Sequence, residues 1–205
     1  MPEREIAAVV FDIGGVLLDW DPRHLYRQLF EDPGQMTEFL ATVCTSDWHR
    51  SHDLGVDTTQ SCRQLALEYP GYADMIMAWA DRGEEMIAGP IDGTVAILAE
   101  LKTAGLPCYL LSNMEPDKYA VRLERFEFLQ WFDGAVVSGI EGVAKPNPAI
   151  FEILVDRHGL DPARTVFIDD SPGNVDAARS TGLDAVRFVS PEALRGDLRD
   201  RGLPV

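Results

Sequence analysis

Short apolar runs alternate with amphipathic segments along most of the chain. Between these runs, apolar residues recur at helical spacing and stop before a glycine, which predicts helices over residues 94–104, 148–158 and 173–181. Alternating strands and helices predict an α/β fold with a parallel sheet that is covered by helices on both faces. The runs themselves predict strands buried on both faces, four of them strong and the last one weaker: residues 6–11, 108–111, 134–137, 165–168 and 185–189.

Residues 19–88 interrupt this alternation, because they contain no strand pattern. Their apolar spacing predicts four helices, near residues 24–30, 36–43, 59–68 and 75–86. The simplest arrangement is an all-helical cap over residues 19–88, inserted into an α/β core made of residues 1–18 and 89–205. Such an insert follows the first strand and lies at its carboxyl end, where open α/β sheets bind ligands.

Composition is that of an ordinary globular protein, with 205 residues of which 46% are hydrophobic. No apolar run approaches the roughly 18 residues that cross a bilayer, and the first residues lack the layout of a signal peptide, so we expect a cytoplasmic protein, monomer or homodimer. The three cysteines match neither a zinc pattern nor a disulfide framework and are predicted to be reduced and buried: Cys44, Cys62 and Cys108.

The net charge of −16, from 18 basic and 34 acidic residues, argues against nucleic acid and membrane surfaces as partners. An anionic substrate would therefore need a local counter-charge. A few cationic side chains and a metal ion would have to supply it.

Polar residues follow the four strong strands. Asp12, Gly14 and Gly15 follow the first strand, and Ser112 and Asn113 follow the second. Lys145 stands before two prolines after the third, and the adjacent Asp169 and Asp170 end the fourth. Each motif alone also suits a turn or a helix cap. Together they place three carboxylates, a hydroxyl, an amide and a lysine at one edge of the sheet.

Adjacent carboxylates at the end of an apolar strand repel one another, and a bound cation relieves that repulsion. A small number of hard oxygen ligands suits Mg²⁺, which also coordinates the phosphate oxygens of a substrate. Lys145 supplies a point charge for the same phosphate. A carboxylate nucleophile completes a site for phosphoryl transfer to Asp12 and then to water.

The order and spacing of these motifs resemble those of the haloacid dehalogenase-like hydrolases, in the phosphatase branch with a helical cap after the first motif. The resemblance implies a Rossmann-like core and a small phosphorylated metabolite, such as a sugar phosphate, as substrate. By the same resemblance, Asp12 is the nucleophile and Lys145 neutralises it. Gly14, Gly15, Ser112, Asn113 and Lys145 bind the phosphoryl group, and Mg²⁺ is held by Asp12, the Gly14 carbonyl, Asp169 and Asp170. Asn174 supports the loop, and the resemblance leaves open which of the two adjacent Asp residues binds the metal directly.

Gly14 departs from the family pattern, which has a second Asp there as general acid and base. We therefore expect substrates with good leaving groups, or an acid from the cap. The nearest candidates in sequence are Asp19, Asp21 and His24. Residues that suit substrate selection by the cap combine aromatic rings with cations: Trp20, Arg23, Trp48, His49 and Arg50.

Two other functions fit the same motifs. A 2-haloacid dehalogenase uses the same nucleophile, but it has no use for the Asp169–Asp170 pair. A catalytically weakened, phosphatase-like binding protein would account for Gly14.

Overall fold

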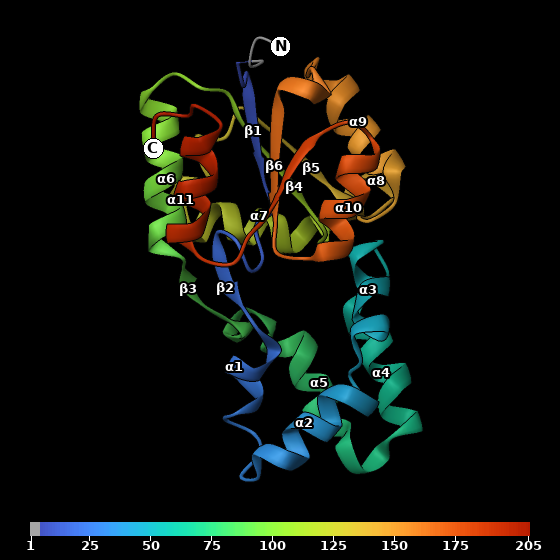
Figure 1. Ribbon diagram of the computed structural model, residues 1–205. Coiled ribbons are helices and arrows are strands. Elements are labelled where there is room, and N and C mark those ends of the chain that lie inside the picture. The colour runs from blue at the N-terminus through green and yellow to red at the C-terminus, as the bar shows by residue number, and fades with distance from the viewer. Residues whose placement is uncertain (1–4) are drawn as a thin grey trace.

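A five-stranded parallel sheet forms the centre of the computed structural model, which describes residues 5–205. The chain forms the Rossmann-like α/β fold that the sequence predicts, and every predicted strand is present, with ends within two residues of those predicted. β1 lies between β4 and β6, so the strand order reverses beside it, and this is where such sheets bind ligands (Figure 1). The strands are, in spatial order, β5 (Gly134–Val137), β4 (Cys108–Ser112), β1 (Ala8–Phe11), β6 (Thr165–Asp169) and β7 (Asp184–Arg187).

Helices cover both faces of the sheet (Figure 1). Along β1, Val9 and Phe11 pack into one hydrophobic cluster with α6 (Asp92–Thr103) and α11 (Pro191–Asp200), whereas Val10 faces the other cluster. That second cluster contains α9 (Pro148–His158) and α10 (Pro172–Ser180). The side-chain period of two along a strand is thus the reason that one apolar run can serve two layers of helices.

The remaining helices of the core are short or rich in charged residues. α7 (Pro116–Arg125) and α11 were not predicted, because charged residues occupy half of their positions and leave a narrow apolar stripe. α8 (Ser138–Glu141) is a single turn. Four 3₁₀ segments complete the part of the chain that the structure describes: Pro70–Tyr72, Gly83–Met86, Glu127–Trp131 and Pro162–Arg164.

Five helices between β2 and β3 form a helical insert with a hydrophobic cluster of its own. Tyr26 lies fully buried in this cluster, with aromatic neighbours, and its hydroxyl donates to the Met75 carbonyl at 3.0 Å. Four of the helices match the predicted ones, and α3 is additional. They are α1 (Pro22–Tyr26), α2 (Pro33–Thr42), α3 (Ser46–Asp53), α4 (Thr58–Glu68) and α5 (Ala73–Asp81). The three cysteines are free and buried, as predicted.

Two short antiparallel strands, β2 (Leu18–Trp20) and β3 (Ile87–Pro90), join the insert to the core. They were not predicted, because strands of three and four residues are too short to show a period. A two-stranded ribbon therefore connects the insert to the core at the carboxyl end of the sheet, where Figure 1 shows the helices of the insert grouped together. Within residues 5–205, no helix combines the length and the apolar character that a bilayer crossing requires.

Candidate active site

Asp12 directly follows β1, and its backbone N–H donates to the Ile168 carbonyl of β6 at 2.9 Å. Its carboxylate is held through one oxygen only. Oδ1 accepts hydrogen bonds from the Ile13 N–H at 2.7 Å and the Ser112 hydroxyl at 2.9 Å, and it lies 2.9 Å from the Lys145 ammonium. None of the hydrogen bonds made by residues 5–205 ends on Oδ2. One oxygen is fixed and the other is free, as an attacking carboxylate requires.

Lys145 is the central cation of the site, and its side chain is only 1% exposed. Its ammonium also donates to the Leu111 carbonyl at 2.8 Å and to Asp169 Oδ2 at 2.7 Å, so all three N–H bonds have partners. Burial opposes the ammonium charge, but the carboxylates of Asp12 and Asp169 outweigh it and raise the pKa of Lys145. The lysine is therefore charged at neutral pH.

Asn113 fixes the backbone of Lys145 from the neighbouring loop. Its side-chain amide donates to the Lys145 carbonyl at 2.9 Å, and its side-chain carbonyl accepts from the Lys145 N–H at 2.9 Å. Both ends of this side chain are thus occupied by the protein. In this arrangement Asn113 positions the lysine, and the second N–H of its amide has no partner among the described residues, so its role toward the phosphoryl group stays a prediction.

The two acidic residues at the end of β6 differ in their surroundings. Asp169 is fully buried and accepts hydrogen bonds from the Ser171 N–H at 2.9 Å and from the Asn174 amide at 3.0 and 3.1 Å. Together with Lys145, these donors use most of its acceptor capacity. Asp170 is exposed at the rim, and no side chain of the described residues donates to its carboxylate. Partial burial and the charge of Asp169 raise the pKa of Asp170.

An acidic cluster results from this arrangement, because Asp12, Asp169 and Asp170 each offer an oxygen within 4.8 Å of the others. Burial and the neighbouring carboxylates raise the pKa of Asp12 even though Lys145 opposes the rise. One ammonium group thus faces three carboxylates, and a divalent cation would balance the charge. Hard carboxylate oxygens are the donors that Mg²⁺ prefers, so these residues fit that ion.

Gly15 brings the first motif close to the fourth. It adopts φ +73°, and a Cβ atom built on it would lie 2.7 Å from Asp170 Oδ2. Gly14 differs, because its built Cβ meets only the Trp20 Cβ at 3.9 Å. A Cβ atom at position 14 would therefore fit, so close packing does not require a glycine there.

We expect Gly15→Ala to lower the free energy of unfolding by about 1–2 kcal/mol, because the left-handed backbone and the contact with Asp170 both oppose a methyl group. Urea unfolding of this variant beside Gly14→Ala measures the effect at two adjacent glycines. Equal losses for both variants would contradict the assignment of the strain to Gly15.

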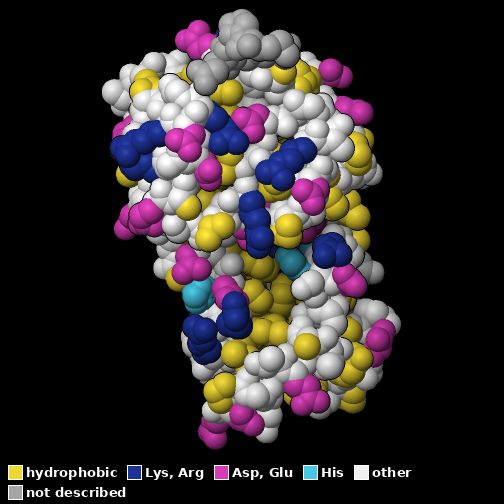
Figure 2. Space-filling model, in the orientation of Figure 1, with side chains coloured by type: hydrophobic (Ala, Val, Ile, Leu, Met, Phe, Trp, Pro, Cys, Tyr) yellow, Lys and Arg dark blue, Asp and Glu magenta, His cyan; other side chains and the backbone are white. Residues whose placement is uncertain are grey.

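A hollow with an apolar floor separates the sheet-containing part from the helical insert (Figure 2). The selection residues that we expected are divided between two places. Trp20 of β2 stacks on His49 of α3 with ring centroids 5.2 Å apart, and Trp48 packs edge-on against Trp79. Burial lowers the pKa of His49 to about 3, so its ring is neutral. Arg23 lies outside this group, in a surface ion pair with Asp21.

The three expected acid candidates, Asp19, Asp21 and His24, each pair with a neighbouring side chain. Asp21 caps α1 and pairs with Arg23, whose hydrogen bonds lower the pKa of Asp21 against the effect of its partial burial. Asp19 is exposed and lies 3.1 Å from the His24 ring nitrogen. The structure instead shows a buried carboxylate that we did not predict, Asp53, at the last position of α3.

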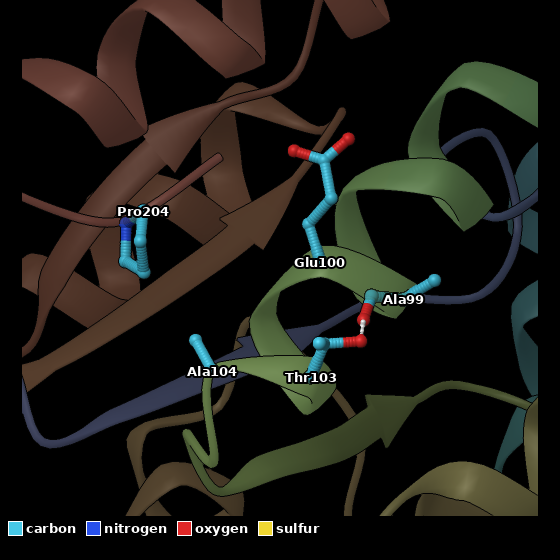
Figure 3. Close-up of a pocket in the computed structure, with 5 residues that line it drawn as sticks. All are labelled: Ala99, Glu100, Thr103, Ala104 and Pro204. Carbon is cyan, nitrogen blue, oxygen red and sulfur yellow. Dashed lines mark hydrogen bonds between the residues drawn. The ribbon is translucent and has the colours of Figure 1, made fainter.

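A cavity beside Lys145 opens between the helical insert and the core, and a second cavity lies away from the site. One of about 720 Å³ is lined by Arg50, Asp53 and Leu54 of the insert, by Asn113, and by residues 142–148 of the core, which include Lys145. The other, of about 430 Å³, lies between α6 and the C-terminal residues (Figure 3). Its one charged residue, Glu100, is paired with Arg195 at 2.6 Å, and it contains no group suited to catalysis.

The fold and the site define the class of protein. The model of the haloacid dehalogenase-like hydrolases matches residues 6–182, and the chain belongs to this family of enzymes. It is 27% identical over 94% of its length to the sesquiterpene phosphatase astK of Aspergillus oryzae, and it covers 94% of that protein. It is 32% identical over 88% of its length to the GMP/IMP nucleotidase YrfG of Escherichia coli, of which it covers 81%.

A solved structure shows the same fold. It is a wild-type enzyme of this family from Bacteroides thetaiotaomicron in complex with magnesium and inorganic phosphate. The TM-score is 0.65 at 21% identity, over 90% of this chain and 95% of that one. The relatives named as phosphatases and nucleotidases act on different phosphorylated compounds, so the substrate has to be argued from the site itself.

Proposed function

We propose that this enzyme is a Mg²⁺-dependent phosphatase that hydrolyses a small phosphorylated metabolite through an aspartyl-phosphate. The observation that carries the proposal is the Asp12 carboxylate, with Oδ1 held by three donors and Oδ2 free. The magnesium and phosphate in the related structure and the phosphatase names of the relatives support it.

In the first step, Asp12 Oδ2 attacks the phosphorus, the bond to the ester oxygen breaks, and that oxygen takes up a proton. In the second step, a water molecule attacks the phosphorus of the aspartyl-phosphate, gives up a proton and releases phosphate and the Asp12 carboxylate. Ser112 and Lys145 hold Asp12 in position, and the lysine offsets the negative charge of the phosphoryl group.

Four groups would hold the metal: the carboxylates of Asp12, Asp169 and Asp170, and the Gly14 carbonyl. Asp170 is the better direct ligand of the acidic pair, because Asp169 already accepts hydrogen bonds from Asn174, Ser171 and Lys145. When bound, the ion neutralises phosphoryl oxygens and lowers the cost of bringing an anion to this acidic site.

The helical insert, residues 19–88, is proposed as the cap over the core of residues 1–18 and 89–205. Its stacked aromatic rings, Trp20 and His49, would contact the part of the substrate that leaves. A cytoplasmic location, and a monomeric or homodimeric state, stay predictions.

A screen of phosphorylated metabolites with Mg²⁺, including sugar phosphates and nucleotides, tests the proposal. We expect phosphate release that a chelator abolishes. Halide release from 2-haloacids that is insensitive to the chelator would indicate a dehalogenase, and tight binding of phosphorylated compounds without turnover would indicate a binding protein.

We expect Mg²⁺ to raise the melting temperature, because it relieves the repulsion within the acidic cluster. At a hundred times its dissociation constant, the ion adds about 2.7 kcal/mol to the free energy of unfolding. Asp170→Ala should lose most of this shift, whereas Asp176→Ala, an exposed acid of α10, should retain it. An unchanged Mg²⁺ shift in Asp170→Ala would contradict the assignment of Asp170 as a ligand.

A further inference from the structure

The proposed reaction needs a proton donor that the first motif does not contain, since position 14 is a glycine. Expulsion of an alkoxide without an acid is slow, and a positioned acid raises the rate by about 10²–10⁴-fold. The donor has to lie on the substrate side of Asp12, facing the leaving oxygen, so the helical insert is the place to look for it.

Asp53 is the one carboxylate of the insert that is buried among residues 5–205. It is 9% exposed, it ends α3, and it lines the same cavity as Asn113 and Lys145. No hydrogen bond made by residues 5–205 ends on its side-chain oxygens. A buried carboxylate without a donor is costly for the fold, and it is suited to giving a proton to a ligand in the cavity.

The backbone of Asp53 is tied to the core. Its carbonyl accepts a hydrogen bond from the Ser138 hydroxyl at 2.5 Å, and that hydroxyl accepts from the Met114 N–H at 3.0 Å. Met114 lies two residues after Ser112, and Ser138 follows β5. This connection fixes the end of α3 beside the carboxyl ends of β4 and β5, next to the motif residues.

Burial, against the effect of most charged groups around it, makes the Asp53 carboxyl a weaker acid than an exposed one. Burial raises the pKa of Asp53 to about 6. Lys118 and Arg122 of α7 and Lys145 of the core pull the value down, and Glu115 before α7 pushes it up. An acid whose pKa lies near the working pH can both donate a proton and take one back.

We infer that Asp53 is the general acid and base of this phosphatase, supplied by the helical insert in place of the residue missing at position 14. The inference rests on the proposed function. As the bond between phosphorus and the ester oxygen breaks, the Asp53 carboxyl gives its proton to that oxygen and becomes a carboxylate. In the second step the carboxylate takes a proton from the attacking water, which restores the acid.

The test compares substrates with different leaving groups in Asp53→Asn. Asparagine keeps the shape of the side chain but has no carboxyl proton to give to the leaving oxygen. With a simple alkyl phosphate such as glycerol 2-phosphate, we expect kcat/KM to fall about 100-fold. With p-nitrophenyl phosphate, whose leaving group needs little protonation, the fall should stay within about fivefold. The alkaline limb of the kcat/KM profile for the alkyl ester should disappear.

Asp47→Asn is the matched control, because Asp47 lies on the exposed side of the same helix in a surface pair with Arg50. It should keep both activities. Asp53→Glu retains a carboxyl and should keep part of the activity on the alkyl ester. Circular dichroism of all three variants verifies the fold.

Equal losses on the two esters, or an unchanged pH profile in Asp53→Asn, would overturn the role of Asp53 and leave the phosphatase proposal intact. That proposal fails separately, if the wild-type enzyme and Asp12→Asn release phosphate from p-nitrophenyl phosphate at the same rate.

Discussion

Asp12→Asn should lower kcat for phosphate release by on the order of 10⁴-fold or more, since the amide cannot form the aspartyl-phosphate. The substitution is isosteric. Its carbonyl oxygen takes the place of Oδ1 and keeps the donors that hold it, the Ile13 N–H and the Ser112 hydroxyl. The fold should therefore persist, and the loss should appear in kcat.

Single-turnover kinetics with p-nitrophenyl phosphate measures this loss, and a melting curve verifies that the variant is folded. Asp12→Ala serves as a second variant, because it cannot return to Asp by deamidation. Asp176→Asn, at an exposed acid of α10, is the control and should keep its activity. Near wild-type turnover in Asp12→Asn would rule out covalent catalysis by this carboxylate.

Lys145→Ala should lower the free energy of unfolding by about 3 kcal/mol, because removing one partner of a buried ion pair leaves the other uncompensated. Here the remaining carboxylates are Asp12 and Asp169, 2.9 and 2.7 Å from the ammonium in the wild type. Activity should fall as well, since Asp12 Oδ1 loses the charge that balances it.

The loss in Lys145→Ala should depend on pH. Without the ammonium, the already raised pKa of Asp12 rises further, so the folded state of the variant binds a proton that the unfolded state does not hold. Its stability is therefore highest in acid and falls as the pH rises through that pKa. Urea unfolding at about pH 5 and about pH 8 should show the larger deficit at the higher value.

Lys102→Ala removes a lysine that pairs with Asp133 at the surface, at 2.6 Å, and should cost less than about 1 kcal/mol. A deficit in Lys145→Ala as small as that of the control would contradict the structural role of Lys145. Mg²⁺ should restore part of the lost stability, because it supplies positive charge to the same carboxylates.

The predicted strands and four motifs were recoverable from sequence because their signals are local. Buried strands such as β1 and β6 read as continuous apolar runs, and parallel strands bring their carboxyl ends to one edge whatever lies between them. Residues at those ends, Asp12 and Lys145 among them, could therefore be grouped without knowledge of any distance.

Contacts between residues that lie far apart in the sequence could not be predicted in this way. The clamp of Asn113 on Lys145 joins residues 32 positions apart, and α3 is too polar for its apolar stripe to be recognised. Asp53 has no local signal at all, because only burial against the core separates it from exposed acids such as Asp47.

The sequence by itself determined the class of fold, the chemical nature of the site and the absence of an acid at Gly14, since these depend on residue type and on position along strands. The tertiary structure alone decided which oxygen of Asp12 is free, which acidic residue of the pair is satisfied, and that Asp53 is the buried carboxylate at the cavity. These depend on hydrogen-bond geometry and desolvation, which arise only when distant segments pack together.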